Sequence, residues 1–187
     1  MAMLPSPEVP IAGPILVLME LLILLLAPAI VLQMVALRTR AKSGVQAWGI
    51  AALVFGSLLA GVTSAVHFTI LTVAGHPKFA SLEVAPFLLS FRWPSVAYAL
   101  DILAWDLFFP LAVVFAGLTL TGSGLEAAIR RLFFCSGALA LAGIAGVFWG
   151  DMNLRNIGIL GYAVVYPLAT GLLTLLFFRE RRLRVDA

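Results

Sequence analysis

The stretch SVAYALDILAWDLFFPLAVVFAGL, residues 95–118, is long and apolar enough to cross a bilayer, for which about 20 residues suffice. It nevertheless carries two carboxylates, Asp101 and Asp106, followed by Pro110. A charged side chain at the centre of a membrane helix costs about 2.5–3.5 kcal/mol on insertion scales, so such groups usually face a protein interior or a water-filled cavity. The stretch therefore predicts a membrane span that is surrounded by other helices.

The whole chain has the composition of a membrane protein. Of its 187 residues, 63% are hydrophobic and 11% are charged, and the mean hydropathy is +1.10. A soluble domain of this size could not bury so much apolar surface. We therefore expect one all-α integral membrane domain over residues 1–187, in a bacterial plasma membrane. Membrane lipids are expected partners, and no basic groove or motif indicates a nucleic-acid partner.

The apolar runs predict five transmembrane helices, at approximately 13–37, 46–74, 96–120, 130–149 and 157–178. We number them spans 1 to 5. A further apolar piece at 84–93 contains Pro86, is followed by Pro94 and is too short to cross the bilayer. Its aromatic residues and arginine favour a short interfacial helix between spans 2 and 3.

The Lys and Arg residues gather at one end of the predicted spans. Nine fall at that end: Arg38, Arg40, Lys42, Arg130, Arg131, Arg179, Arg181, Arg182 and Arg184. Three fall at the other end: Lys78, Arg92 and Arg155. Because cytoplasmic loops carry an excess of Lys and Arg, we expect the N-terminus outside and the C-terminus in the cytoplasm.

In this orientation, nearly all the ionisable side chains within the spans lie in the outer half. The candidates for acid/base chemistry are Asp106, Asp101, Glu20 and His67. The candidates for contact with a ligand are Arg92, Trp93, Tyr98, Trp105, Asn156, Tyr162 and Tyr166. Simpler readings exist for some of these: His67 ends a stripe of small residues typical of helix packing, and Tyr162 suits an interfacial belt.

The spacing within span 3 predicts its geometry. Five residues at about 100° each place Asp101 and Asp106 about 140° apart on a regular helix. The two acids would then meet different neighbours, with span 3 at the centre of the bundle. Pro110 has no N–H for the carbonyl of Asp106, so we expect a kink there. Pro28 and Pro167 repeat the arrangement in spans 1 and 5, although prolines in membrane helices are often only packing features.

Three other features complete the interpretation. Cys135 is the single cysteine, which excludes an intramolecular disulfide, and its apolar surroundings predict a buried thiol. Small residues in span 4, among them Ser136, Ala140 and Gly143, predict close helix contact. Arg155, in the loop before span 5, either pairs with a carboxylate or belongs to a solvated turn.

No catalytic signature is present, and we expect no metal and no cofactor. His67 and the acids lie on separate helices, so they are only a weak indication of a metal site. His67 and His76 are a still weaker indication of a haem site. The polar groups favour a pocket in the outer half for a small apolar or lipid-like molecule, in either a binding protein or an enzyme that acts on this molecule by acid/base chemistry. The alternatives are a proton- or cation-coupled transporter and a structural or assembly subunit. The sequence leaves a homo- or hetero-oligomer open.

Overall fold

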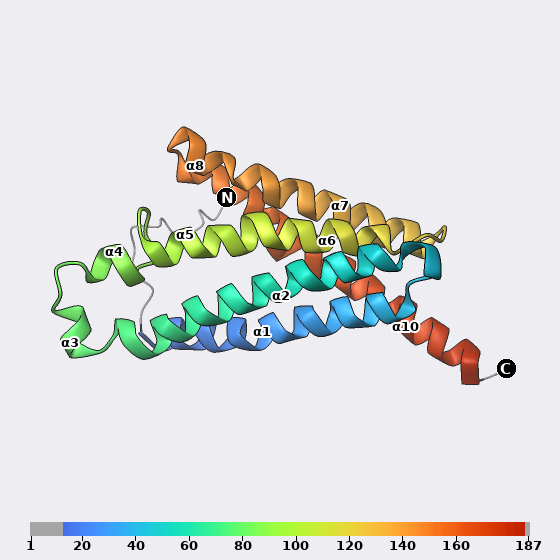
Figure 1. Ribbon diagram of the computed structural model, residues 1–187, viewed down its shortest axis with the longest axis horizontal. Helices are drawn as coiled ribbons and strands as arrows, with labels where there is room; N and C mark the ends of the chain where they lie inside the picture. The colour runs from blue at the N-terminus through green and yellow to red at the C-terminus, as the bar shows by residue number, and fades with distance from the viewer. Residues whose placement is uncertain (1–12, 186–187) are drawn as a thin grey trace.

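The computed structural model describes residues 13–185, and it contains helices and no strand within this range (Figure 1). The α-helices are α1 (Gly13–Arg40), α2 (Gln46–Thr69), α3 (Pro77–Ala80), α4 (Ala85–Leu89), α5 (Val96–Ile102), α6 (Phe109–Leu118), α7 (Leu125–Gly143), α8 (Ala145–Trp149), α9 (Arg155–Leu160) and α10 (Tyr166–Val185). The 3-10 turns are η1 (Ser43–Val45) and η4 (Met152–Leu154). The π-helical turns are η2 (Ile70–Ala74), η3 (Leu103–Phe108) and η5 (Gly161–Val165).

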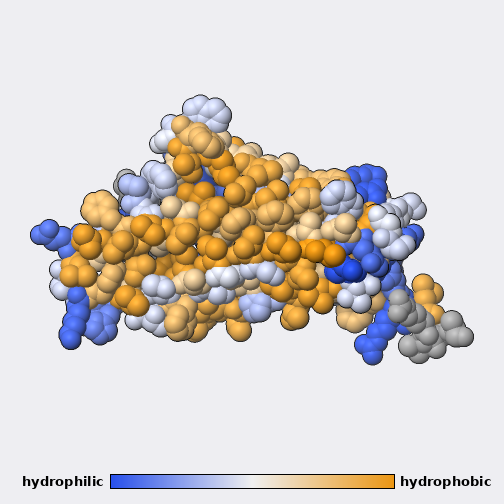
Figure 2. Space-filling model, in the orientation of Figure 1, coloured by the Kyte–Doolittle hydropathy of each residue, from blue (hydrophilic) through white to orange (hydrophobic). Residues whose placement is uncertain are grey.

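Five helical segments of the described chain are long and apolar enough to cross a membrane, as the sequence predicted. They are Pro14–Arg40, Ser43–Ala74, Val96–Leu118, Leu125–Trp149 and Met152–Leu183. Spans 4 and 5 begin earlier than predicted, because their first turns carry charged side chains that are paired within the protein, Glu126 and Arg155. Figure 2 shows the corresponding surface, which is apolar over the middle and hydrophilic towards both ends.

The spans pack largely in chain order. Helix α1 packs on α2, α2 on the η3–α6 part of span 3, α6 on α7, and α7 on α9, η5 and α10 of span 5. Span 3 has the largest buried share of the five spans, which agrees with the predicted central position. Spans 1 and 5 are the two ends of this series, and a cavity lies between them.

Small residues let span 5 approach span 4 closely, as predicted for the latter. Ser136, Ala140 and Gly143 of α7 are all buried. The hydroxyl of Ser136 donates a hydrogen bond of 2.9 Å to the carbonyl of Gly161. A Cβ added at Gly161 would lie 2.6 Å from the Ser136 carbonyl oxygen. Only glycine permits this backbone approach, which fixes the position of α9 and of Arg155 at its start.

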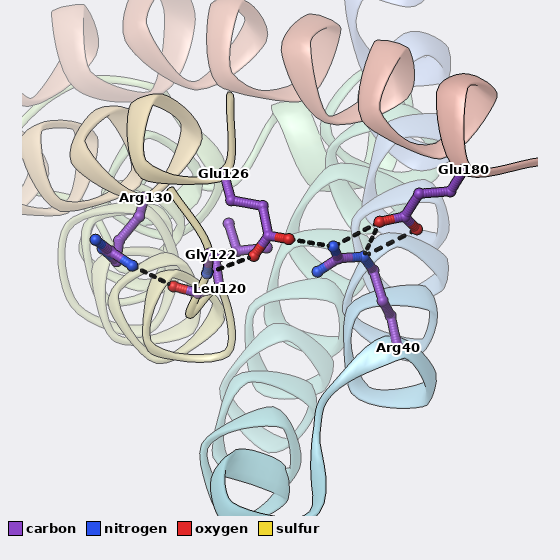
Figure 3. Close-up of polar contacts among 6 residues, drawn as sticks. All are labelled: Arg40, Leu120, Gly122, Glu126, Arg130 and Glu180. Carbon is purple, nitrogen blue, oxygen red and sulfur yellow. Dashed lines mark hydrogen bonds and ion pairs between the residues drawn. The ribbon is translucent and has the colours of Figure 1, made fainter. Parts of the chain in front are cut away.

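Ion pairs join the spans at the end that carries the chain's C-terminal arginines (Figure 3). The guanidinium of Arg40 donates to Glu180 from Nε at 3.0 Å and to Glu126 from Nη2 at 2.5 Å. Glu126 also accepts the N–H of Gly122 at 2.9 Å. Arg40 therefore connects spans 1, 4 and 5.

The prediction that Cys135 is buried was wrong, because this residue is exposed on the outer face of α7. Its neighbours in the sequence are apolar because α7 faces lipid as well as protein. In a membrane helix both faces are apolar, so hydropathy alone does not separate a core position from a lipid-facing one. Cys135 still lies inside the fourth apolar span.

Candidate functional site

Arg155 holds both aspartates of span 3. Its Nε donates to Oδ2 of Asp106 at 2.8 Å, and its Nη2 donates to Oδ2 of Asp101 at 2.6 Å. Arg155 is 5% exposed and Asp106 is fully buried. The guanidinium also lies over the ring of Tyr98, 4.6 Å from its centroid, where a cation is attracted to the aromatic face. Asp106 therefore lies inside the bundle and accepts a hydrogen bond from another helix.

The two aspartates share a partner because span 3 is not a regular α-helix. Its residues 103–108 form the π-helical turn η3, in which the N–H of Phe109 bonds the carbonyl of Ala104, five residues back. A π-turn needs about one residue more than an α-turn, so residues five apart lie more nearly above one another. The prediction that Asp101 and Asp106 meet different neighbours was therefore wrong for Arg155, which both acids bind, although Asp101 also lies beside His67 of α2.

The π-turn η3 also explains how the helix accommodates Pro110, which has no N–H to donate. The turn ends two residues before this proline, so the chain opens where a regular helix would need the missing N–H. Span 5 repeats this local structure, because η5 ends two residues before Pro167 and the N–H of Tyr166 bonds the carbonyl of Gly161. Pro28 behaves differently and lies within the continuous helix α1. At the position where a kink was expected, span 3 contains the π-turn η3.

The second oxygen of Asp106 lies against two glycines. Oδ1 accepts no hydrogen bond among the described residues. A Cβ added at Gly158 would lie 2.8 Å from this oxygen, and one added at Gly143 would lie 3.2 Å from it. Helices α7 and α9 therefore form a narrow seat for the carboxylate, which larger residues would close.

Asp101 joins this ion pair to a second one. Glu20 of α1 and His67 of α2 are both buried, and His67 Nδ1 lies 2.5 Å from Glu20 Oε2. The other ring nitrogen, Nε2, lies 3.6 Å from Asp101 Oδ1 and has no hydrogen-bond partner among the described residues. An acid inside an apolar span needs a polar partner, and for Glu20 that partner is His67 of α2. We call Glu20, His67, Asp101, Asp106 and Arg155 the polar cluster.

A cavity of about 560 Å³ opens between α1 and span 5 and reaches one side of the polar cluster. Its lining is almost entirely apolar, apart from three members of the cluster and a few hydroxyl groups. The lining residues are Leu16, Met19, Glu20, Ile23, Leu26, His67, Phe91, Asp101, Trp105, Tyr162, Ala163, Tyr166, Pro167 and Thr170. We call this space the groove.

A smaller cavity of about 280 Å³ continues the groove along α1 and α10. The two share Leu26, Tyr166 and Thr170 in their linings. At this junction the hydroxyl of Tyr166 donates to Gln33 Oε1 at 2.6 Å. Beyond it the lining is chiefly apolar and includes Leu173 and Phe177. An elongated apolar space therefore has a charged group of residues at one end.

The four residues predicted for acid/base chemistry come together in the polar cluster. Of those predicted to contact a ligand, Trp105, Tyr162 and Tyr166 line the groove, and Tyr98 contacts Arg155. The other three do not line it: Arg92, Trp93 and Asn156 are exposed. Arg92 instead lines a separate hollow beside α4.

The sequence predicted no site role for Gln33 or Phe91, and it left the pairing of Arg155 with a carboxylate as one of two alternatives. Arg155 lies at the edge of an apolar run, where a charged residue resembles a loop residue. The signal that could have found it is the glycine pattern around it, because Gly158 and Gly161 allow span 5 to approach span 4. The neighbouring Asp151 caps its own turn by accepting the N–H of Asn153 at 3.0 Å.

Fold and site together define an all-helical protein with five apolar spans and a buried ionic cluster beside an apolar groove. Comparison with protein families, with curated proteins and with solved structures found no match. Within residues 13–185, no group of three or more His, Cys, Asp or Glu side chains has a geometry that could hold a metal ion.

Proposed function

We propose that this protein binds a small apolar or lipid-like molecule in the groove, with the polar end of that molecule at the polar cluster. The observation that carries the proposal is the groove itself, an apolar cavity of about 560 Å³ that ends at Glu20, His67 and Asp101. Binding sites for small molecules commonly have about 300–1,000 Å³ and a mostly apolar lining with a few polar groups that fix orientation.

The position of the groove between spans 1 and 5 supports entry from the bilayer. Apolar side chains line both walls, and several of them, including Leu26, are substantially exposed. A molecule dissolved in the membrane would reach the groove sideways without crossing a charged surface. The polar cluster would then be the only strongly charged region that it meets among the described lining residues.

Acid/base chemistry on the bound molecule is the more specific form of this proposal. His67 lines the groove, its Nδ1 is paired with Glu20, and its Nε2 has no hydrogen-bond partner among the described residues. A carboxylate on one ring nitrogen fixes the imidazole, so the other nitrogen can accept or deliver a proton. Asp106 serves a different purpose in this scheme, since it anchors Arg155 away from the groove lining.

We further propose that the groove opens towards the outer half of a bacterial plasma membrane. The basic residues near Arg40 and Arg179 would face the cytoplasm, and α3 and α4 would lie at the outer interface. The side chain of Arg184 lies outside the described side chains. In Figure 1, α3 and α4 lie at the end of the bundle away from the C-terminus, where the first turns of span 3 begin.

A coupled transporter and an assembly subunit are the other candidate functions. A transporter would need a polar path to the opposite end, where the described acids Glu126 and Glu180 are held by Arg40. A subunit would fill the groove with a partner helix. The groove favours the binding function over both, because it joins an apolar channel to an imidazole nitrogen that has no hydrogen-bond partner among the described residues.

Photolabelling tests the proposed function. The probe is a long-chain alcohol with a photoreactive diazirine, added to protein in micelles of an uncharged sugar detergent. We expect labelling of the segment that contains Tyr162 and Tyr166, loss of this labelling in Leu26→Trp, and retention in Leu25→Trp. Leu26 lines the groove, whereas Leu25 is 70% exposed and outside its lining. Equal labelling of the two variants would overturn the proposal.

A further inference from the structure

The polar end of the groove presents two atoms that face each other, Nε2 of His67 and Oδ1 of Asp101. His67 Nδ1 lies at hydrogen-bond distance from the carboxylate of Glu20 and so carries the hydrogen of that bond. In the neutral ring, Nε2 is then an acceptor. It faces Oδ1 of Asp101, also an acceptor, across 3.6 Å. Two acceptors in this arrangement do not bond each other, and a donor between them would satisfy both.

The net charge of the polar cluster also favours a group that donates hydrogen bonds and carries a positive charge. It contains three carboxylates, from Glu20, Asp101 and Asp106, and one guanidinium, from Arg155. Even an imidazolium at His67 would leave one negative charge in excess. An anionic head group would therefore meet repulsion in a cavity of low dielectric, whereas a cation would be attracted.

We propose that the groove takes a single-chain amphiphile whose head is a primary ammonium group. The ammonium donates to His67 Nε2 and to Asp101 Oδ1, and its alkyl chain follows α1 past Leu26 towards Gln33. An ammonium has three donors and no acceptor, which matches the atoms presented. The inference rests on the proposed function, since it assigns the head group of the molecule bound there.

The length of the groove fits one alkyl chain. Glu20 and Gln33 are about 20 Å apart along α1 at about 1.5 Å per residue. One leaflet of the hydrocarbon core is about 15 Å thick, half of the full core. A chain of the length found in membrane lipids would therefore extend from the polar cluster into the second cavity, between Leu173 and Phe177.

Competition against the photoreactive alcohol tests the head group. The competitors share a hexadecyl chain and are compared at equal mole fraction in the same micelles: hexadecylamine, hexadecanol, hexadecyltrimethylammonium and palmitate. We expect hexadecylamine to displace the probe at a mole fraction about tenfold lower than hexadecanol, the scale of one hydrogen bond to a charged group. Trimethylammonium should be weaker than the amine because it has no N–H, and palmitate should be weakest.

Matched variants locate the effect at the polar cluster. Glu20→Gln should reduce the preference for amine over alcohol, whereas Glu83→Gln, which alters an exposed acid outside the groove lining, should leave it unchanged. Equal displacement by amine and trimethylammonium, or stronger displacement by palmitate, would overturn the head-group assignment. If all competitors act equally and Leu26→Trp still blocks labelling, the proposed function stands and this inference fails.

Discussion

Arg155 Nε donates to Oδ2 of Asp106 at 2.8 Å, and the two side chains are 6% and 0% exposed. Asp106 is the deepest acid of span 3, and Arg155 is the first residue of α9. The pair therefore joins the middle of one apolar span to the beginning of another. A second bond of 2.6 Å from Arg155 to Asp101 extends the connection along span 3.

Removing the guanidinium should destabilise the protein strongly. Arg155→Gln leaves Asp106 buried without its cation, and breaking a buried ion pair from one side costs about 3–5 kcal/mol. The free energy of unfolding can be measured by titrating sodium dodecyl sulfate into sugar-detergent micelles, with circular dichroism as the signal. Arg179→Gln, which alters an exposed arginine, is the control. A loss below about 1 kcal/mol would contradict the central position given to Arg155.

Asp106 should tolerate an amide better than an apolar side chain. Asp106→Asn keeps the size and an oxygen for Arg155, which also retains Asp101, so we expect a folded protein and unaltered photolabelling of the groove. Asp106→Leu removes the acceptor and should cost about 1–3 kcal/mol. The same unfolding titration measures both. Loss of labelling in Asp106→Asn without loss of stability would show that Asp106 acts on the ligand and would contradict the anchoring role proposed for it.

Gly158→Ala should destabilise the seat of Asp106. Its Cβ would lie 2.8 Å from Asp106 Oδ1 and 3.3 Å from the Ala140 carbonyl oxygen, so α9 or the carboxylate must move. Overpacking of this kind costs about 1–3 kcal/mol. Gly171→Ala is the matched control, because nothing lies within 4 Å of its added Cβ. In a helix this control should stabilise by about 0.5–1 kcal/mol.

Thiol labelling should establish which end of the protein faces outside. In a Cys135→Ser background, a cysteine at Lys78 should react with a membrane-impermeant maleimide only from outside the cell. Native Cys135 should resist the reagent from both sides, because its exposed face lies inside the fourth apolar span and is covered by lipid. Reaction at position 78 from the cytoplasmic side alone would reverse the proposed orientation.

The sequence predicted the number of spans because hydropathy is a local property. About 20 apolar residues in a row indicate a crossing whatever the neighbouring helices are. Polar residues inside such a run, Asp106 and Glu20 for example, must find partners because lipid offers none. Their burial followed from this constraint, whereas the choice of His67 as the partner of Glu20 came from the structure.

Which side chains pair across the bundle could be determined only from the three-dimensional structure. The 140° estimate for Asp101 and Asp106 assumed a regular helix, and the π-turn η3 changed which face each acid presents. The sequence did not reveal the exposure of Cys135 either, because a helix in lipid is apolar on both its inner and outer faces. Both errors concern direction around a helix axis, which composition does not encode.

Sequence alone determined that this chain forms five apolar helices with acids that cannot face lipid. The tertiary structure decided that one arginine, from the edge of span 5, holds two of those acids, and that spans 1 and 5 leave a groove beside them. The physical reason is the range of the forces involved. Burial of an apolar run depends on the run itself, whereas an ion pair depends on the packing that brings side-chain atoms of two distant helices within about 3 Å of each other.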